Sequence, residues 1–149
     1  MLVTNHVLSG AVLGHLVPDP VAAFTLGVAS HLALDAVPHW GVPRPIREVL
    51  HVAVPDGLIG AATMVVVTAT SAPDRRARVF AGMAGAALLD LDKPSLLFFG
   101  RSPFPRVVDG VHQRVQRESP RRMPQEILVG LTGAVLVAAL TRRHARTTG

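Results

Sequence analysis

Five apolar segments run along the chain, each bounded by proline, glycine or charged residues. They cover residues 3–17, 21–37, 49–72, 79–91 and 127–140. Their lengths and the turn residues between them predict helices joined by short connections. Asp19 and Pro20 separate the first two segments and favour the start of a helix, because aspartate accepts hydrogen bonds from the first free amides and proline is tolerated in the first turn. The first two segments therefore predict a helical hairpin.

The third and fifth segments are the strongest candidates for crossing a membrane. The third contains a charge-free stretch of 17 residues, 57–73, which reaches the lower limit of the about 17–25 residues that a spanning helix needs. In membrane proteins, basic residues are more frequent in the cytoplasmic loops than in the loops on the other side. Arginines flank the fifth segment on both sides, so this rule does not settle its orientation. Hydrophobic residues form 49% of the chain and charged residues 17%, below the about 25% of typical soluble domains.

We therefore predict an all-α fold, a small polytopic helical membrane bundle that forms a single domain over residues 1–149. Glycines one turn apart inside the apolar segments, such as Gly82 and Gly85, favour close packing of these helices. The alternative is a soluble bundle of very apolar helices, because apolar runs of about 10–14 residues are more often core helices than spans.

Residues 93–122 form the polar part of the chain, with seven basic and two acidic residues. Within this segment Val107, Val108 and Val111 recur at helical spacing, whereas most of the arginines fall elsewhere on the same helix. This pattern predicts an amphipathic helix that lies on the headgroup layer of a membrane, with lipid as its partner. His112 follows Val108 by four residues, so it should lie on or beside the apolar face.

The net charge of +5 and the lack of cysteine narrow the chemistry further. The basic residues stand between or after the apolar segments and are not interleaved with aromatic residues, so we expect no nucleic acid partner. Without cysteine, the chain has neither a disulfide nor a thiolate ligand. A metal ion would need nitrogen and oxygen ligands from histidine and carboxylate side chains.

The end of the second apolar segment holds residues that can carry chemistry. His31 and Asp35 are four residues apart, so they project about 40° apart on one helix face, close enough to share a metal ion or a hydrogen bond. Asp35 lies in the last turn before Pro38, where the helix dipole disfavours a carboxylate by about 0.3–1 kcal/mol. His39 follows directly. A His–Asp pair that only satisfies two buried polar groups is the simpler interpretation of this pattern.

Three further carboxylates stand near the ends of predicted helices. Asp90 and Asp92 close the fourth apolar segment, where the helix dipole and their mutual repulsion are both unfavourable. Either a divalent cation or the neighbouring Lys93 would relieve that cost. Asp56 stands near the start of the third segment, where a first-turn acid is common but an ionisable group at the mouth of a spanning helix is also a functional candidate.

Taken together, these motifs resemble a known family, the membrane-bound metal-dependent hydrolases. That family has an early histidine, a Pro-Asp-x-Asp segment that closes an apolar helix, and a later histidine near an arginine. The corresponding residues here are Asn5-His6, Ser30-His31 through Asp35 to Pro38-His39, Leu89-Asp90-Leu91-Asp92-Lys93-Pro94-Ser95, and His112-Gln113-Arg114. Leu89 stands where the family usually has proline. The resemblance covers most of residues 1–115.

The resemblance implies a divalent-metal hydrolase of the bacterial inner membrane that acts on a lipid or another membrane-associated ester. The metal ligands that it implies are His6, His31, Asp35, Asp90, Asp92 and His112. Zinc or manganese suits such a mixed shell, and His39 or Asp56 would serve as the general base. The arginine-rich segment 93–122 would hold an anionic substrate such as a phospholipid headgroup.

Two other functions would use the same residues. In a non-catalytic membrane scaffold or partner-binding protein, the histidines and aspartates would form a structural hydrogen-bond network. In a carrier of ions or small solutes they would act as relays inside the membrane, and the chain would have to oligomerise because few segments are long enough to span. Convergence of His31, Asp35 and Asp90, with His6 or His112 completing the shell, would favour a metal site over separate structural pairs.

Overall fold

The computed structural model describes residues 1–42 and 45–147, and apart from an isolated β-bridge between His39 and Glu118 the regular elements in them are helices. The α-helices are α1 (Val3–Leu16), α2 (Pro20–Asp35), α3 (Leu50–Thr70), α4 (Arg76–Ala87), α5 (Asp92–Phe99), α6 (Arg106–Val115) and α7 (Met123–Thr147). Short 3₁₀ turns are η1 (Ile46–Glu48), η2 (Pro73–Arg75), η3 (Leu88–Leu91) and η4 (Pro120–Arg122). The predicted all-α fold is confirmed.

Helix boundaries follow the predicted segments closely in the first half of the chain. Asp19 caps α2, because its Oδ1 accepts a hydrogen bond from the Ala22 amide at 2.7 Å. The fourth predicted segment is divided, since α4 ends at Ala87 and η3 leads directly into α5. The polar segment holds two helices, α5 and α6, and α6 contains the valines of the predicted amphipathic helix.

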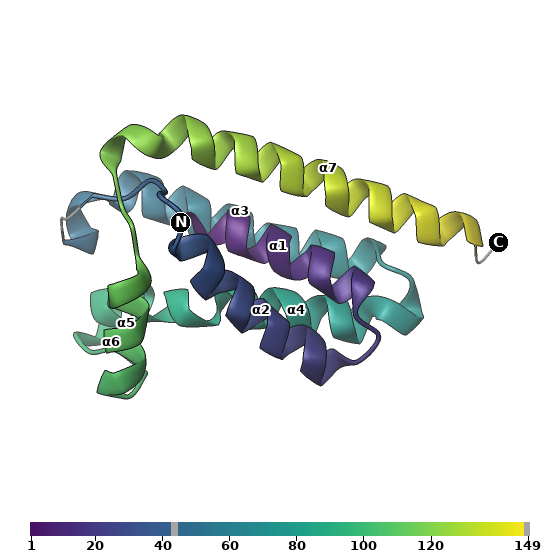
Figure 1. Ribbon diagram of the computed structural model, residues 1–149, viewed down its shortest axis with the longest axis horizontal. Helices are drawn as coiled ribbons and strands as arrows, with labels where there is room; N and C mark the ends of the chain where they lie inside the picture. The colour runs from purple at the N-terminus through teal and green to yellow at the C-terminus, as the bar shows by residue number, and fades with distance from the viewer. Residues whose placement is uncertain (43–44, 148–149) are drawn as a thin grey trace.

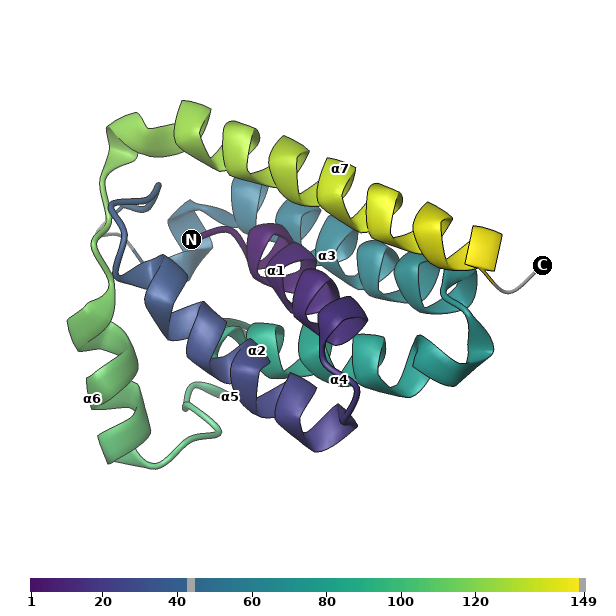
Figure 2. The same ribbon diagram turned by 45° about the vertical axis from the view of Figure 1, so that its right-hand side comes forward.

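Helices α1, α2 and α4 form the core of the molecule, and glycines bring their backbones together (Figure 2). Gly82 of α4 lies against Gly10 of α1 and Gly27 of α2, where an added Cβ atom would overlap the backbone of the neighbouring helix. The buried side chains around this contact include Val7, Ala11, Val79 and Met83. Small residues at the contact therefore let three short helices pack as one tight unit.

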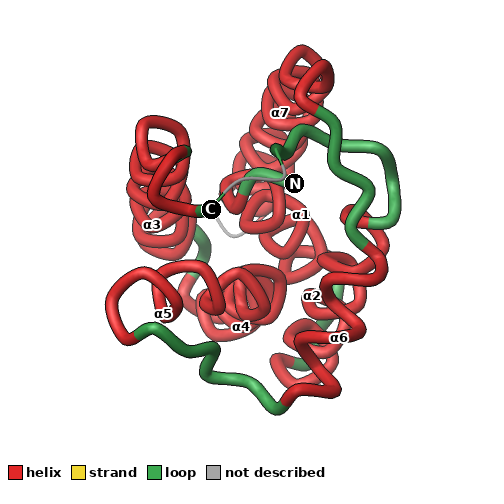
Figure 3. The backbone as a smooth tube through the Cα atoms, turned by 90° about the vertical axis from the view of Figure 1, so that its left-hand side faces the viewer, coloured by secondary structure: helices red, strands yellow, loops and turns green. Residues whose placement is uncertain are grey.

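Helices α3 and α7 lie outside this core, with α1 between them (Figure 3). Among the described residues these two are long and apolar enough to cross a membrane, over Leu50–Thr70 and Pro120–Arg143. In each of these helices only 11% of the most apolar window is buried inside the protein. Leu58 on α3 and Leu131 on α7 are 67% and 63% exposed. A core helix of a soluble bundle would bury such residues, so α3 and α7 are not core helices of this fold.

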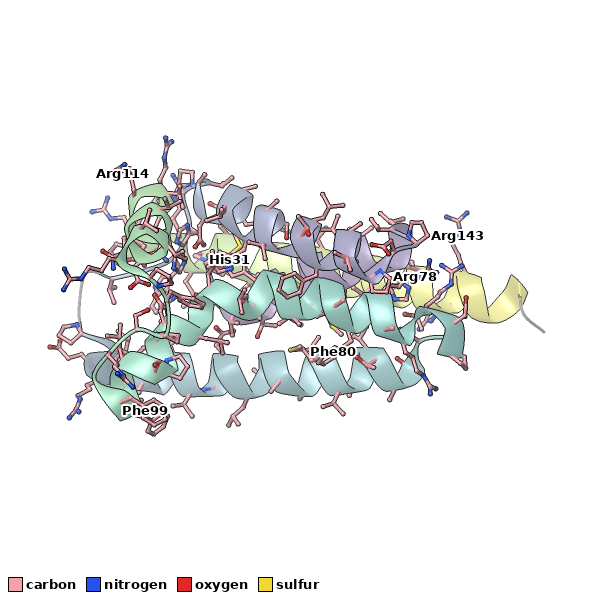
Figure 4. The ribbon with its side chains drawn as sticks, turned by 90° about the horizontal axis from the view of Figure 1, so that it is seen from below. His31, Arg78, Phe80, Phe99, Arg114 and Arg143 are labelled. Atoms are coloured by element: carbon pink, nitrogen blue, oxygen red, sulfur yellow. The ribbon has the colours of Figure 1, made fainter. Side chains whose placement is uncertain are left out.

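Charged side chains stand at both ends of the bundle. Figure 4 shows Arg114 at one end, Arg78 and Arg143 at the other, and Phe80 between them. Bundles that cross a bilayer typically have this distribution, because arginine is favourable in the headgroup layers and apolar side chains in the hydrocarbon.

One end of the molecule combines the starts of α1, α3 and α7 with the end of α2 (Figure 1). Helix α6 packs across this end against α2. The chain after α6 then runs beside residues 39–41, where the His39 amide donates to the Arg117 carbonyl and the Ser119 amide donates to the His39 carbonyl. The histidines and aspartates singled out above lie at this end.

Candidate metal centre

The candidate site gathers side chains from elements that are far apart in the sequence. They are His6 from α1, His31 and Asp35 from α2, His39 from the turn after α2, Asp90 from η3, Asp92 from the start of α5 and His112 from α6. Apart from Asp92, all of these side chains are buried. The sequence thus predicts a set of residues that the fold brings into one cluster.

Three of these side chains form a tight triangle. His31 Nε2 lies 3.0 Å from His112 Nε2, and Asp35 Oδ2 lies 3.2 Å from the first nitrogen and 3.3 Å from the second. A tetrahedral zinc ion with ligands about 2.0–2.2 Å away holds them about 3.3–3.6 Å apart. The triangle therefore matches three corners of such a site with only small adjustments, and its residues are able to hold a metal ion.

Both imidazoles are oriented by a partner on the far side of the ring. His31 Nδ1 lies 2.7 Å from the Ala86 carbonyl oxygen, so Nδ1 carries the proton and Nε2 has a free lone pair. His112 Nδ1 lies 3.5 Å from Asp92 Oδ2, so it is turned away from Asp35. Ligating histidines usually have such an oxygen behind them. Two lone pairs 3.0 Å apart repel each other, so the His31–His112 contact needs a proton or a cation between the two nitrogens.

A second group overlaps the first at His31. The ligand atoms of His6, His31 and Asp90 lie within 4.8 Å of one another, and the His6 ring stacks on the His31 ring with centroids 3.9 Å apart. His6 Nε2 lies 3.9 Å from Asp90 Oδ2 and 3.2 Å from Asp35 Oδ1. Because Ala86 already binds His31 Nδ1, His31 has one lone pair and can serve only one ion. The more compact triangle with His112 is the primary candidate.

Several buried polar atoms around the triangle lack a hydrogen-bond partner among the described residues. They are Nδ1 of His6, Nε2 of His39, Oδ2 of Asp90 and Oδ1 of Asp92. Each such atom costs about 1–3 kcal/mol, and native proteins seldom hold several in one place without a function. This concentration is a second observation, independent of the triangle, that indicates a ligand at the cluster.

Burial and neighbouring charges shift several pKa values here. Burial by itself would raise the pKa of Asp35, but hydrogen bonds with His112, His31 and His6 outweigh it and hold that pKa well below its usual range. Burial lowers the pKa of His6, so this imidazole is neutral, as metal ligation requires. Burial also opposes a charge on His112, but hydrogen bonds with Asp35 and Asp92 raise its pKa to about 9. The ionised Asp35 therefore attracts a cation to its neighbours, either a proton or a metal ion.

Lys93 neutralises one side of Asp90. Its Nζ donates to Asp90 Oδ1. Burial would raise the pKa of Asp90 and lower that of Lys93, but their attraction outweighs burial, so the pKa of Asp90 is lowered and that of Lys93 is raised. Asp90 Oδ2 is left facing His6.

Two of the predicted site residues make contacts that favour roles other than the predicted ones. Asp92 is predicted as a metal ligand, but η3 turns the chain and places it in the first turn of α5, where its Oδ2 faces His112 Nδ1. Asp92 therefore orients His112 from behind.

Asp56 is predicted as a general base, but its Oδ2 and Oδ1 accept hydrogen bonds from the Val3 and Thr4 amides at 2.7 and 3.1 Å. Both oxygens of Asp56 are thus used to cap α1 and to hold it against α3.

Two further groups beside the triangle are missed by the sequence reasoning. Gln116 Nε2 lies 3.0 Å from His112 Nε2 and 3.4 Å from Asp35 Oδ2. The amino group of Met1 lies 2.7 Å from Asp35 Oδ1. Gln116 follows His112 by four residues, so helical spacing was a usable signal for it.

Glu126 is a third polar group that the sequence reasoning misses. It is buried at the start of α7 and accepts hydrogen bonds from the Leu2 and Trp40 amides and from Asn5 Nδ2. These bonds tie α7 to α1 and to the turn that carries His39. The signal was available, because Glu126 is the acidic residue that opens the last apolar helix.

Comparisons with family models, with curated proteins and with solved structures found no match to this chain. The resemblance to the membrane-bound metal-dependent hydrolases therefore stays a prediction that rests on the quoted motifs. The chain has a buried His/Asp cluster that can hold a metal ion, at one end of an all-helical bundle with two helices long and apolar enough to cross a membrane.

Proposed function

We propose that this chain is a metal-dependent hydrolase of the bacterial inner membrane that binds zinc or manganese at His31, Asp35 and His112. The observation that carries the proposal is the triangle of His31 Nε2, His112 Nε2 and Asp35 Oδ2, with sides of 3.0, 3.2 and 3.3 Å. The oxygens behind both imidazoles support it, because they hold the rings in the orientation that ligation requires. The motifs quoted above support hydrolysis as the reaction.

The donor set fits a divalent ion of borderline or hard character. Two imidazoles and one carboxylate, in a chain without cysteine, suit zinc or manganese. Three protein ligands are also typical of catalytic zinc sites, which keep a fourth position for water or substrate. When bound in this way, such an ion polarises an ester oxygen and lowers the pKa of a coordinated water to about 7.

His39 is the residue best placed to move a proton. Its Nδ1 donates to the Val37 carbonyl at 2.9 Å, so the lone pair is on Nε2. That nitrogen is buried, lies 3.8 Å from Asp35 Oδ1 and has no hydrogen-bond partner among the described residues. A neutral imidazole in this position can accept the proton of an attacking water and return it to the leaving alcohol.

The location in a membrane is supported by α3 and α7. The 21 residues of α3 make a helix about 32 Å long, close to the about 30 Å of bilayer hydrocarbon. Both helices begin at the end of the molecule that holds the cluster (Figure 1). In a bilayer they would therefore run in the same direction and place the metal centre near one headgroup layer, within reach of a lipid or another membrane-associated ester.

One observation favours a different function. Lys93 pairs with Asp90 and the Met1 amino group pairs with Asp35, so each of these two carboxylates of the cluster has a cation beside it without a metal ion. On that basis the cluster would be a structural network in a non-catalytic membrane scaffold or partner-binding protein.

The test is hydrolysis of a panel of fluorogenic carboxylic and phosphate esters by detergent-purified protein, with metal content measured on the same samples. We expect a chelator to abolish hydrolysis and zinc or manganese to restore it. His39→Gln should retain the metal and lose about 10²–10⁴-fold in rate. The matched control is His51→Gln, an exposed histidine on α3, which should change neither. A metal-loaded protein that hydrolyses no ester in the panel would favour the scaffold.

A further inference from the structure

A cavity of about 450 Å³ lies between α3 and α5, and its wall includes Asp90 of the cluster. Figures 3 and 4 show α5 beside the first half of α3, at the end of the bundle that carries the metal centre. The volume lies within the range of about 300–1,000 Å³ that small-molecule sites have. The cavity is therefore large enough for a ligand, and Asp90 of the cluster forms part of its wall.

The wall of this cavity is apolar except at a few groups. Val54 and Leu58 from α3 and Leu97 and Phe98 from α5 form part of it. Its charged groups are Asp90, Lys93 and Asp56; the first two pair with each other, and the carboxylate of Asp56 is bound to the α1 amides. The remaining polar character thus lies at Asp90 and Lys93, beside the cluster, and a ligand that matches this wall has one polar end and one long apolar part.

Apolar side chains at the rim face outward. Leu58 is 67% exposed and Phe98 is 75% exposed, and α3 itself is a candidate membrane span. If α3 lies in a bilayer, the cavity opens toward hydrocarbon, and the molecules that reach it are lipids. Lys93 pairs with Asp90 but keeps further N–H donors, and a bound metal ion would supply the net positive charge that complements a phosphate or another anionic group at the polar end.

A second apolar cavity provides a contrast. It measures about 660 Å³ and lies between α1, α3 and α7, with Leu8, Val66 and Val137 in its wall. None of the described residues of the cluster lines it. A lipid chain there would have no access to the metal centre, so the link to Asp90 distinguishes the cavity between α3 and α5.

We propose that the cavity between α3 and α5 binds one alkyl chain of an anionic membrane lipid and so presents the lipid's polar group to the metal centre. This inference rests on the proposed function, which it extends by naming the substrate class. A lipid that enters from the bilayer keeps its chain in apolar surroundings throughout, whereas a short soluble ester has no apolar chain to fill the cavity, so this wall favours lipids over short soluble esters.

The glycines on two helices provide a matched pair of variants. Gly57 lines the cavity, and an added Cβ atom there would meet no atom within 4 Å, so Gly57→Leu should fill the cavity without disturbing the fold. Gly110 on α6 has the same free space and lies outside both cavities, so Gly110→Leu is the control. Leu97→Trp fills the cavity from the opposite wall and serves as a second variant.

The experiment places the full chain in nanodiscs of phosphatidylethanolamine and phosphatidylglycerol that contain a phosphatidylglycerol with a photoreactive diazirine on its acyl chain. Labelled positions are mapped by mass spectrometry, and metal content is measured on the same samples. We expect labelling of α5 and of the first half of α3 to exceed labelling of the exposed face of α7. Gly57→Leu and Leu97→Trp should reduce labelling of α5 to the level seen on the exposed face of α7, since each fills space that the alkyl chain would occupy. Gly110→Leu should leave it unchanged.

Labelling of α5 that is no stronger than labelling of α7, or that both cavity-filling variants leave unchanged, would overturn the inference. Its failure is distinguishable from failure of the proposed function. Stoichiometric metal without cavity labelling contradicts the lipid-chain site alone. Cavity labelling without metal supports a lipid-chain site and contradicts the proposed hydrolase.

Discussion

Helices α1, α2 and α4 pack against one another through glycine and alanine, whereas α3 and α7 keep long aliphatic side chains on the outside of the molecule. In the first group the stabilising contacts are between backbones, which need small residues. In the second group the apolar surface has no partner within the described protein, so it needs an apolar environment. The contrast shows that the two described helices long and apolar enough to cross a membrane do not form the core.

The same contrast explains why the cluster lies where it does. His6, His31 and Asp35 are on the tightly packed helices, whose backbones cannot shift without a clash between Gly10, Gly27 and Gly82. A metal centre must hold its ligands to within about 0.5 Å, and a rigid scaffold does this better than a loop. The outer helices need no such rigidity, because their proposed partner is fluid lipid.

The largest effect on stability should come from a large residue at the contact between the core helices. Gly82→Leu would place several carbons where the backbone of α1 already lies, so we expect destabilisation of about 3 kcal/mol or more, or no folded protein. Gly57→Ala on α3 is the control, because an added Cβ atom there has free space, and it should stabilise by up to about 1 kcal/mol. Thermal unfolding in one detergent measures both. Equal effects of the two substitutions would remove the distinction between the two groups of helices.

A charged residue on the exposed face of α7 tests whether the outer helices lie in a membrane. Leu131 is 63% exposed, and in a bilayer Leu131→Asp should cost about 2.5–3.5 kcal/mol of insertion free energy. In water the same substitution at an exposed position would change stability by less than about 0.5 kcal/mol. A membrane-insertion assay distinguishes these values. The wild-type protein should also resist extraction by high salt and by alkali, and its release by salt alone would contradict the membrane assignment.

The pH dependence of the metal-free protein should reflect His112. Its pKa is raised from 6.5 to about 9 by Asp35 and Asp92, so its contribution to stability is complete below about pH 6.5 and is lost as the pH rises through about 9. We expect chelator-treated protein to lose on the order of 1–3 kcal/mol across this interval. His112→Gln should flatten the profile, and so should saturating zinc, because the metal requires a neutral imidazole. An unchanged slope in His112→Gln would assign the pH dependence to another group.

The smallest effect should come from the arginines of α6 and its C-terminal flank. Arg106, Arg114 and Arg117 are exposed, as is Val107 on the same helix, whereas His112 faces the cluster. Reversing one arginine to glutamate should weaken binding to anionic vesicles by about 1–2 kcal/mol at low salt, since each basic residue near the surface contributes about 1 kcal/mol. Vesicle flotation measures it, with Arg47→Glu, outside α6, for comparison. Unchanged binding at low salt would contradict the interfacial placement of α6.

Local spacing was sufficient to predict part of the site. His31 and Asp35 share a helix face because they are four residues apart, and their convergence with His112 confirms that the pattern marked a cluster. The two candidate spans were predictable for a similar reason, because length and hydropathy are local properties.

The rest depends on contacts that a single sequence does not encode locally. The role of Asp92 follows from the turn η3, which redirects the chain into α5, and the pattern of residues 79–91 gave no sign of it. The position of His112 follows from docking of α6 on α2, about 80 residues away in the chain. Asp56 is an ionisable residue near the start of a candidate span, which is typical of a functional residue, but it caps α1. Only the packing of α1 on α3 reveals this role.

The central claim is that His31, Asp35 and His112 hold a divalent metal ion, and the most direct measurement is the metal content of protein purified without chelator. We expect about one zinc or manganese ion per chain in the wild type. Asp35→Asn keeps the shape of the side chain but removes its charge, so its metal content should fall by more than about tenfold. Asp74→Asn, at an exposed aspartate in η2, should leave the metal content unchanged. A wild-type protein without a stoichiometric divalent ion, and with both variants as stable as the wild type, would contradict the metal centre and favour the structural network.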